Sequence, residues 1–560
     1  LAVRSWAKCS RPYEYAFSRT RWITAEDVEN LRTRHLAWWK RFWSMSEISL
    51  DDPVIEQRYY LSKYMLASLS RDPDYPPNIL GISTFDRPAW NGNYKINYNH
   101  QSPYLNLMVS GHFEQSDPHD APYLKLMEIS DEMCKRLLHH EGLYYPLGLG
   151  PDGVVSEALL LHMKSPALHG ALNMIYRYEI SQDTRYAWKV YPYLRGVAEF
   201  WEKDLVLRDG VYHVVGDGMH ERTDGNIREN GVPEDPVNTL GYLKTFFTRL
   251  PKISEALELD EEKRTKWQEI AQNLAPYPKG TIREIQDNPT LWKEVDVKLE
   301  DLLPQEMLDK EIYYDEGVGG KWSFHFPGNI MHIYPGNAVG LGSDQKELEV
   351  ARNTVHIHSL VENKLGELEY KKALERAADE KKATVVKHAH FYKAGAFNAS
   401  NLSCLFFTAA VRTGYDPDII WNEMRDMIIH RGIPNGFLKE NPHGIEQLNT
   451  IPDAIQEMML QSYEDVIRIF PVWPRKKHPN ASFRNFRAWG GFEVSASLKD
   501  GEIEKVTVLS HKGNTCRVEN PWPEKSVIVK YGYSGREEVC FGEYLSIELQ
   551  KEEQVLLFVL

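Results

Sequence analysis

The chain has 560 residues, with 42% hydrophobic residues, 26% charged residues and a formal net charge of −14. A chain of this length exceeds one ordinary hydrophobic core, so we expect two or more domains. The acidic balance argues against nucleic acid or an anionic membrane as the partner, and no segment approaches the roughly 18 consecutive apolar residues of a membrane span.

The N-terminal residues predict a terminal fragment and a linker. Residues 1–20 are rich in Arg and Tyr and look like the end of a preceding part of the protein. Residues 21–48 predict a linker helix, in which the apolar Leu31, Leu36 and Trp39 are interspersed with charged side chains. No signal peptide is visible before Leu1, so the expected location, periplasmic or secreted, depends on a targeting segment outside this sequence.

Residues 49–474 predict a helical domain. Apolar side chains recur at positions i, i+3, i+4 and i+7, for example at Leu194, Val197, Ala198 and Trp201. Similar stretches follow at roughly even spacing, which favours an (α/α)6 barrel. Functional side chains usually lie on long loops of such a scaffold. Loops with turn chemistry are expected at residues 71–103, 142–155, 212–237, 311–337 and 432–452.

The hydrophobic period changes to two after Pro474. Residues 492–498 and 504–508 alternate apolar and polar side chains, and Asp500-Gly501 between them is a favourable hairpin turn. Residues 475–560 therefore predict a C-terminal antiparallel β-sandwich domain, which we expect to cap the helical domain.

Asn97 and Asn99 are the most informative residues of the first long loop. They lie in a segment dense in Asn, Tyr and His, which also contains His100. A side-chain amide carries two donors and an acceptor, so it can hold a sugar hydroxyl or orient a water molecule. A loop stabilised by hydrogen bonds of the Asn side chains to the backbone is the alternative explanation.

A second polar cluster lies in the loop at residues 311–337. It contains His325, Asn329, His332 and Asn337. Histidines this close could ligate a metal ion, but their spacing matches no standard site, and we expect neither a metal nor a cofactor. We assign His325, Asn329 and His332 to a sugar-binding wall, with ordinary loop packing as the alternative.

Four short motifs resemble glycoside hydrolase family 95, the inverting α-L-fucosidases and α-L-galactosidases, over nearly the whole chain. Their order and spacing carry the resemblance more than any single match. The motifs are Asn97-Tyr98-Asn99-His100-Gln101, Ile333-Tyr334-Pro335-Gly336-Asn337, Met458-Met459-Leu460-Gln461-Ser462 with the following Ile469-Phe470-Pro471-Val472-Trp473-Pro474, and Ala488-Trp489-Gly490-Gly491-Phe492-Glu493-Val494.

The resemblance implies a role for each catalytic residue. The paired asparagines of the family fall on Asn97 and Asn99, of which one amide positions the attacking water. The family's general acid falls on Glu221, and the carboxylate that polarises the catalytic amide falls on Glu446. The family also carries an N-terminal β domain, so residues 1–20 are expected to be its end.

The implied chemistry is coherent on physical grounds. Inverting hydrolysis needs a protonated carboxylic acid at the leaving oxygen and an activated water on the opposite face of the sugar. An amide is a weak base, so it needs a carboxylate beside it. A glutamic acid serves as the acid only if burial or a second carboxylate raises its pKa.

The chain departs from the family pattern in its sugar-contacting loops. The loop after Glu221 contains Arg222 and Arg228 close to Asp224 and Glu229. The two arginines could bind a uronic or sulfated sugar, because the guanidinium group matches anions in a fork geometry, or they could pair with the two acids. We assign Arg222 to substrate binding together with His100. Asp217 and Asp224 are rivals of Glu221, and Glu464 and Asp465 are rivals of Glu446.

These features predict an inverting exo-glycoside hydrolase that removes a terminal sugar of L-fucose or L-galactose type from an oligosaccharide or polysaccharide. Two alternatives stay open. A polysaccharide lyase on an α/α toroid would use His325, Tyr313 and Arg222 around a uronate. A non-catalytic glycan-binding protein on the same scaffold would bind sugar without turnover.

Overall fold

The computed structural model describes Trp6 and residues 9–81, 89–218, 232–284, 302–316, 328–361, 403–438 and 444–559. By the contacts between their residues, Leu1–Glu47 and Ile48–Leu560 form two separate compact units.

The first unit consists of two helices, α1 (Pro12–Arg21) and α2 (Ala25–Ser44). The structure confirms the helix expected within residues 21–48. It begins at a capping box, in which the Thr24 side chain accepts a hydrogen bond from Asp27 N and the Asp27 carboxylate accepts one from Thr24 N.

Residues 1–20 were expected to be the end of an upstream β domain, but residues 12–20 form a helix. Pro12 occupies the first helical position, where its missing N–H costs nothing. Glu14 in the first turn and two arginines in the last turn complement the helix dipole. These local signals favour a helix over a strand.

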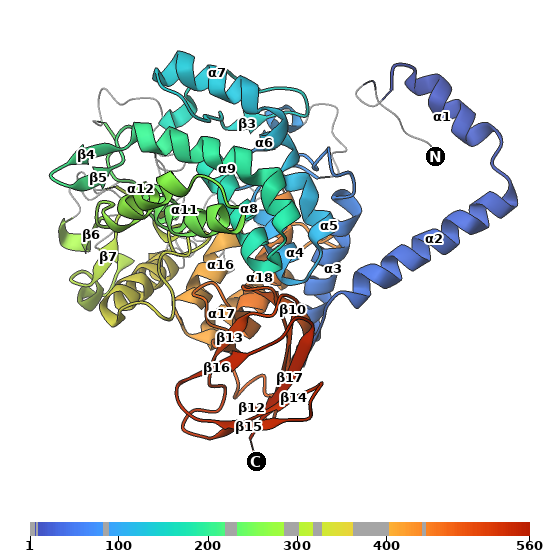
Figure 1. Cartoon of the computed structure of the whole chain (residues 1–560), viewed down its shortest axis with the longest axis vertical. Coiled ribbons are helices and arrows are strands. Elements are labelled where there is room, and N and C mark those ends of the chain that lie inside the picture. The colour runs from blue at the N-terminus through green and yellow to red at the C-terminus, as the bar shows by residue number, and fades with distance from the viewer. Residues whose placement is uncertain are drawn as a thin grey trace, which may run out of the picture. The chain divides into compact units, whose positions relative to one another are not determined.

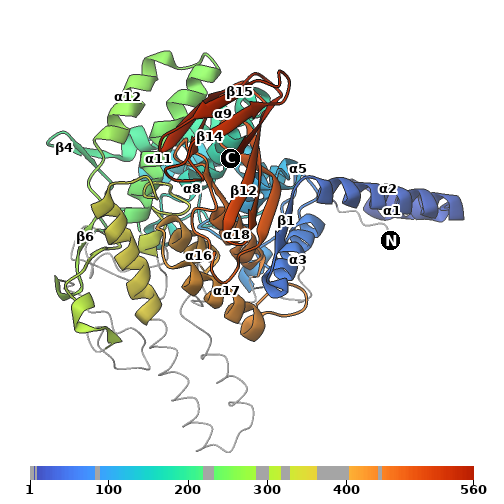
Figure 2. The ribbon, with the colours of Figure 1, turned by 90° about the horizontal axis from the view of Figure 1, so that it is seen from below.

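The second unit is mainly helical, and Figures 1 and 2 show its helices in colours from blue to orange. Its helices are α3 (Pro53–Leu69), α4 (Ser102–Val109), α5 (Phe113–Ser116), α6 (Ala121–Lys125), α7 (Met127–Leu138), α8 (Pro166–Ser181), α9 (Thr184–Asp204), α11 (Val237–Ala256), α12 (Glu261–Gln272), a helix at residues 345–361, α16 (Ser403–Arg412), α17 (Pro417–Arg431) and α18 (Thr450–Met459). Short 3-10 helices are η1 (Ala89–Gly92), η2 (Asp117–His119), η3 (Leu160–His162), η4 (Ile282–Glu284), η5 (Gln305–Met307), η6 (Gly328–Ile330) and η8 (Ile445–Leu448).

The helices fall into two classes by burial. All residues of α18 are buried, and in α8 nearly every residue from Pro166 to Ile180 is. By contrast, α9 and α12 bury one face and expose charged side chains on the other. Helices buried on all sides next to helices with one buried face make an inner and an outer layer, as an (α/α) barrel requires. The mainly helical fold expected for this part is confirmed.

A buried ion pair joins two inner helices. Arg412 of α16 and Glu457 of α18 approach to 2.8 Å, with side chains 5% and 9% exposed. Thr408 of α16 donates a 3.0 Å hydrogen bond to Asp453 of α18. Charges this deep are tolerated because each is paired and hydrogen-bonded.

The C-terminal part is an antiparallel β region. Its strands are β10 (Ala481–Ala488), β11 (Phe492–Lys499), β12 (Glu502–Ser510), β13 (Thr515–Glu519), β14 (Val527–Tyr531), β15 (Glu537–Cys540), β16 (Tyr544–Glu548) and β17 (Glu553–Phe558). The main sheet has the order β1-β10-β11-β12-β17-β14-β15, where β1 is Glu47–Leu50, and β13 pairs with β16. Side chains of β11 alternate between buried and half-buried, as the period of two predicts.

The predicted hairpin turn is present. Lys499 pairs with Glu502, and Asp500 and Gly501 between them have φ angles of 51° and 82°. Both angles are positive, as the tight turn favoured by Asp-Gly requires. The remaining strands form short pairs outside the main sheet. They are β2 (Tyr94–Lys95) with β3 (Gly148–Leu149), β4 (Val206–Arg208) with β5 (Val211–His213), β6 (Lys279–Thr281) with β7 (Glu311–Tyr313), and β8 (Leu460–Gln461) with β9 (Arg468–Ile469).

Helical and β parts of the second unit share one hydrophobic core. Trp489, beside β11, packs on Tyr176 of α8 with ring centroids 5.7 Å apart, and Arg249 of α11 lies over the same indole at 4.6 Å. Residues 48–560 therefore behave as one compact unit, and a domain boundary at residue 474 stays a prediction. None of the described helices combines the length and apolar character that a membrane span needs.

Candidate functional site

The segment that carries Asn97 and Asn99 is a tight, buried turn between β2 and α4. His100 N donates to Lys95 O at 2.8 Å, and Ser102 N donates to Tyr98 O at 2.9 Å. The two asparagines are 3% and 4% exposed. A turn bonded in this way holds their side chains in fixed directions before any ligand arrives.

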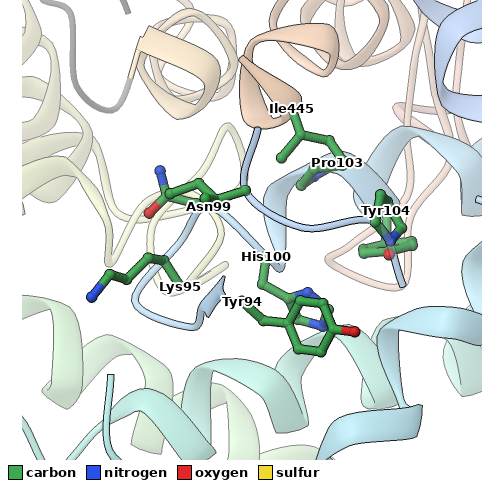
Figure 3. Close-up of a pocket in the computed structure, with 9 residues that line it drawn as sticks. Tyr94, Lys95, Asn99, His100, Pro103, Tyr104 and Ile445 are labelled. Carbon is green, nitrogen blue, oxygen red and sulfur yellow. The ribbon is translucent and has the colours of Figure 1, made fainter. Parts of the chain in front are cut away.

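Side chains of this segment leave it in two directions, as Figure 3 shows. Asn99 and Lys95 point to one side, below Ile445 of η8. His100 points to the other side and lies with Tyr94 and Tyr104. The alternation separates a polar face, which includes Asn99, from an aromatic core.

Asn97 is held from the inner helix α8. The ring Nδ1 of His169 lies 3.0 Å from the carbonyl oxygen of Asn97, and the His169 ring packs on Tyr242 of α11. The sequence analysis missed His169. Its only sequence signal is a histidine within an otherwise apolar helical stretch, which usually marks an ordinary core residue.

Glu446 lies on η8, which is buried along its whole length. Its side chain is 2% exposed, and this burial raises the pKa of the carboxyl group to about 8. A hydrogen bond with the Asn99 side chain acts in the opposite direction, because it stabilises the carboxylate. The structure thus brings the two predicted partners, Asn99 and Glu446, into contact.

The Asn99–Glu446 pair has the composition that water activation requires. The amide can orient a water molecule. Once Glu446 is ionised, which its raised pKa of about 8 places at mildly basic pH, its carboxylate can take up charge as the water loses its proton. A buried carboxyl group with a strongly raised pKa is typical of functional sites. Glu464 and Asp465, the rivals of Glu446, instead form ion pairs with Arg468 and Arg249.

His100 has partners within the protein, and its assignment to substrate binding stays a prediction. Its Nε2 donates a 3.0 Å hydrogen bond to the carbonyl oxygen of His119, and the two rings stack with centroids 5.2 Å apart. Burial lowers the pKa of His100 to about 3, so the ring is neutral. These contacts give His100 a structural role behind the asparagines.

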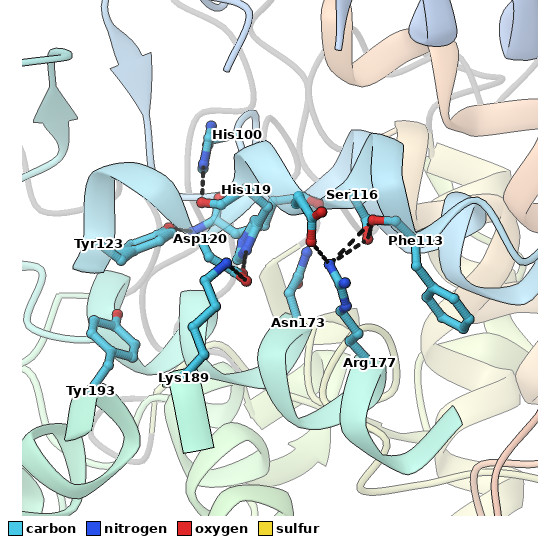
Figure 4. A network of polar contacts seen from close by, with 12 residues as sticks. His100, Phe113, Ser116, His119, Asp120, Tyr123, Asn173, Arg177, Lys189 and Tyr193 are labelled. Carbon is cyan, nitrogen blue, oxygen red and sulfur yellow. Dashed lines mark hydrogen bonds and ion pairs between the residues drawn. The ribbon is translucent and has the colours of Figure 1, made fainter. Parts of the chain in front are cut away.

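Figure 4 shows that this contact continues into a buried polar network. His119 Nδ1 lies 3.0 Å from Asp120, and Lys189 of α9 approaches the same carboxylate at 3.7 Å. Burial raises the pKa of Asp120, but the hydrogen bond and charge of His119 and the neighbouring cations lower it further, so the net shift is downward. The ionised Asp120 therefore holds His119, and His119 in turn holds His100 of the asparagine segment.

Asn329 and His332 lie in the interior, where both are 0% exposed, and their assignment to sugar binding stays a prediction. Asn329 Nδ2 donates to Tyr313 O at 2.9 Å, and its Oδ1 lies 2.6 Å from Nε2 of His358. His332 packs edge-on against Tyr313 with centroids 4.2 Å apart, and burial lowers its pKa to about 3. The sequence placed them in one loop, and the structure places this loop in the core beside α11.

Glu221, Arg222 and His325 lie outside the described residues, so their assignments stay predictions. The residues on either side of 219–231 are described, and they lie side by side. Val215 pairs with Glu234 in an antiparallel bridge, and Gly216 N donates to Pro233 O at 2.8 Å.

Asp217, a rival of Glu221, has both carboxylate oxygens engaged by the protein. One oxygen accepts from Lys164 N at 2.6 Å and Ser165 N at 3.3 Å, and the other accepts from the Thr239 hydroxyl at 2.6 Å. Burial raises its pKa to about 6. These donors tie the residue to the segment just before α8 and to the first turn of α11, which favours a structural role.

One group of possible metal ligands occurs among the described residues. His213, Glu234 and Asp235 bring three ligand atoms within 4.8 Å of one another. All three already have a partner, since His213 lies 2.7 Å from Asp235, and Arg208 pairs with Glu234.

Sequence profiles match both parts of the chain. The profile of the glycosyl hydrolase family 95 catalytic domain matches residues 8–298, more than half of the chain. The profile of the glycoside hydrolase family 95 C-terminal domain matches residues 461–555. Comparison with curated proteins gives no match.

Solved structures with a similar course of the chain have low sequence identity. One is a putative kojibiose phosphorylase from the human microbiome, at 12% identity and a TM-score of 0.47, with 96% of this chain and 64% of that chain covered. Another is an α-L-rhamnosidase from Dictyoglumus thermophilum, at 11% identity and a TM-score of 0.43, with 92% and 50% covered. The chain thus spans between half and two thirds of the length of these proteins.

Proposed function

The chain belongs to glycoside hydrolase family 95, and on this basis we propose that it hydrolyses a terminal glycosidic bond with inversion. In this proposal Asn97 and Asn99 position the attacking water, Glu446 polarises the Asn99 amide, and Glu221 protonates the leaving oxygen. The reaction is an acid–base hydrolysis and needs no cofactor.

The single observation that carries the proposal is the contact of Asn99 with a fully buried glutamic acid. These two side chains come from distant parts of the sequence and meet in the interior of the fold. The family's water-positioning amide and its polarising carboxylate fall on these two residues, so their contact favours hydrolysis over binding alone.

The proposed substrate is an oligosaccharide or polysaccharide that ends in a sugar of L-fucose or L-galactose type. The family resemblance supports this choice. A terminal uronic or sulfated sugar is the second choice, because Arg222 and Arg228 follow the proposed acid. With a glycan substrate of this kind, we also propose a periplasmic or secreted location.

Release of reducing sugar from a panel of fucosylated, galactosylated and uronate-containing glycans tests the proposal. We expect one monosaccharide from the chain ends, and a loss of at least about 10²-fold in turnover for Glu221→Gln, because the acid is removed. Unsaturated uronate products detected by ultraviolet absorbance would assign the protein to the lyases. Binding of a glycan without any product would assign it to the non-catalytic binders.

A further inference from the structure

A second pair of polar residues, Ser102 and Asn449, follows the Asn99–Glu446 pair, each three positions later in the chain. Ser102 begins α4 three positions after Asn99, and Asn449 directly precedes α18 three positions after Glu446. A contact between α4 and Asn449 therefore lies only a few residues from each of the two proposed catalytic side chains.

Asn449 bridges these segments through its side-chain amide. Its Oδ1 accepts hydrogen bonds from Asn106 of α4, at 2.5 Å from the side-chain nitrogen and 3.4 Å from the backbone nitrogen. Its Nδ2 donates to the Ser102 hydroxyl at 3.4 Å. The Asn106 and Asn449 side chains are both 0% exposed, although 343 residues separate them in the sequence.

The backbone of Asn449 ties the bridge to Glu446. Asn449 N donates to Glu446 O at 3.1 Å within η8, and Asp453 N of α18 donates to Asn449 O at 3.0 Å. Cys404 of α16 also contacts this region. Its thiol forms a hydrogen bond with the Ser102 hydroxyl, and it interacts electrostatically with Glu446. The bridge is enclosed by α4, α16 and α18.

We propose that Asn449 is a positioning residue, whose amide latches η8 to α4 and thereby sets the distance between the Asn99 amide and the Glu446 carboxyl group. The catalytic consequence rests on the proposed hydrolase function. The latch itself rests only on the described contacts. A single buried amide suits the position, since it accepts from Asn106 and donates to Ser102 at once.

Steady-state kinetics of Asn449→Ala test the latch against a matched control. The control is Gln456→Ala on α18, the helix that Asn449 precedes, and it removes a buried amide bonded to the Tyr59 hydroxyl at 3.1 Å. Asn449→Ala loses three side-chain hydrogen bonds and Gln456→Ala loses one, so the thermal stability of each variant is measured beside its kinetics. We expect kcat of Asn449→Ala to fall about 10²-fold with KM changed less than about twofold, and kcat of Gln456→Ala to stay within a few-fold of wild type.

Asn106→Ala and the double variant extend the test. Because both amides belong to one latch, the double variant should lose little more kcat than either single variant. Equal loss of kcat in Asn449→Ala and Gln456→Ala, or fully additive losses in the double variant, would show that Asn449 only stabilises the fold and would overturn the proposal.

A readout independent of activity separates failure of the latch from failure of the proposed function. The infrared carbonyl band of protonated Glu446, identified as the difference between wild type and Glu446→Gln, is followed as a function of pH. In Asn449→Ala we expect its midpoint to fall by about one pH unit or more, because water reaches the released carboxyl group. An unchanged midpoint contradicts the latch even if wild type hydrolyses no tested glycan.

Discussion

Replacement of Glu446 by Gln is expected to lower turnover by at least about 10²-fold, because the Asn99 amide loses the carboxylate that lets it activate water. The change keeps the size of the side chain, so folding should be preserved. The matched control is Glu423→Gln on the outer helix α17, where burial also raises the pKa of the carboxyl group, to about 7. Turnover of the control should match wild type, and equal turnover of both variants would remove Glu446 from the mechanism.

The same variant makes a prediction about stability and pH. Burial raises the pKa of Glu446 from its ordinary value of 4.5 to about 8, so the folded protein binds this proton more tightly than the unfolded chain does. The contribution to stability is complete below pH 4.5 and is lost as the pH rises to about 8, at roughly 1.4 kcal/mol for each unit. Gln does not titrate, so this loss disappears in Glu446→Gln.

Urea denaturation at pH 5 to pH 9 measures this difference. We expect the stability of Glu446→Gln relative to wild type to increase between about pH 5 and pH 8 and to level off above. Burial also raises the pKa of Asp217 to about 6 and that of Asp453 to about 7. These two groups lower the free energy of unfolding of wild type and variant equally as the pH rises through this range, so they do not affect the difference. A difference that does not change with pH would mean that Glu446 is ionised in the folded protein throughout.

Asn99→Ala is the second variant with a large expected effect. Loss of the amide removes the group that orients the water, and we expect turnover to fall by at least about 10²-fold with little change in KM. Asn93→Ala serves as the control, because Asn93 is a buried asparagine of the same loop, 7% exposed. Steady-state kinetics on the released sugar decide the outcome. Near-normal turnover of Asn99→Ala would separate the asparagine segment from the chemistry.

Much of the fold follows from patterns within short windows of sequence. Helical spacing identified α9, and the period of two identified β11 and β12 with the turn at Asp500-Gly501. These features succeed because side-chain burial and turn conformation are dictated locally. The prediction for residues 12–20 was wrong because it came from the family resemblance and not from the helix signals in these residues.

The candidate site could be predicted only in part. Family resemblance led to Asn99 and Glu446, whose contact no local pattern could reveal. The assignments of His100, Asn329 and His332 to sugar binding stay predictions, because the sequence could not show that these side chains lie in the interior. There His100 and Asn329 hydrogen-bond to backbone carbonyl groups, and His332 packs against Tyr313.

Residues that support the site were missed for a related reason. His169 and Asn449 act through contacts with chain segments far away in the sequence. Neither the type of residue nor its spacing distinguishes them from ordinary buried polar side chains. Only the folded arrangement shows which backbone or amide each of them holds.

The most direct test of the proposed mechanism is the anomeric configuration of the sugar at the moment of its release. Proton NMR during the first minutes of hydrolysis of an α-linked L-fucoside or L-galactoside records it before mutarotation. We predict that the β anomer appears first, as attack by water on the face opposite the leaving group requires. Initial appearance of the α anomer would contradict an amide-activated water and would require a covalent intermediate in its place.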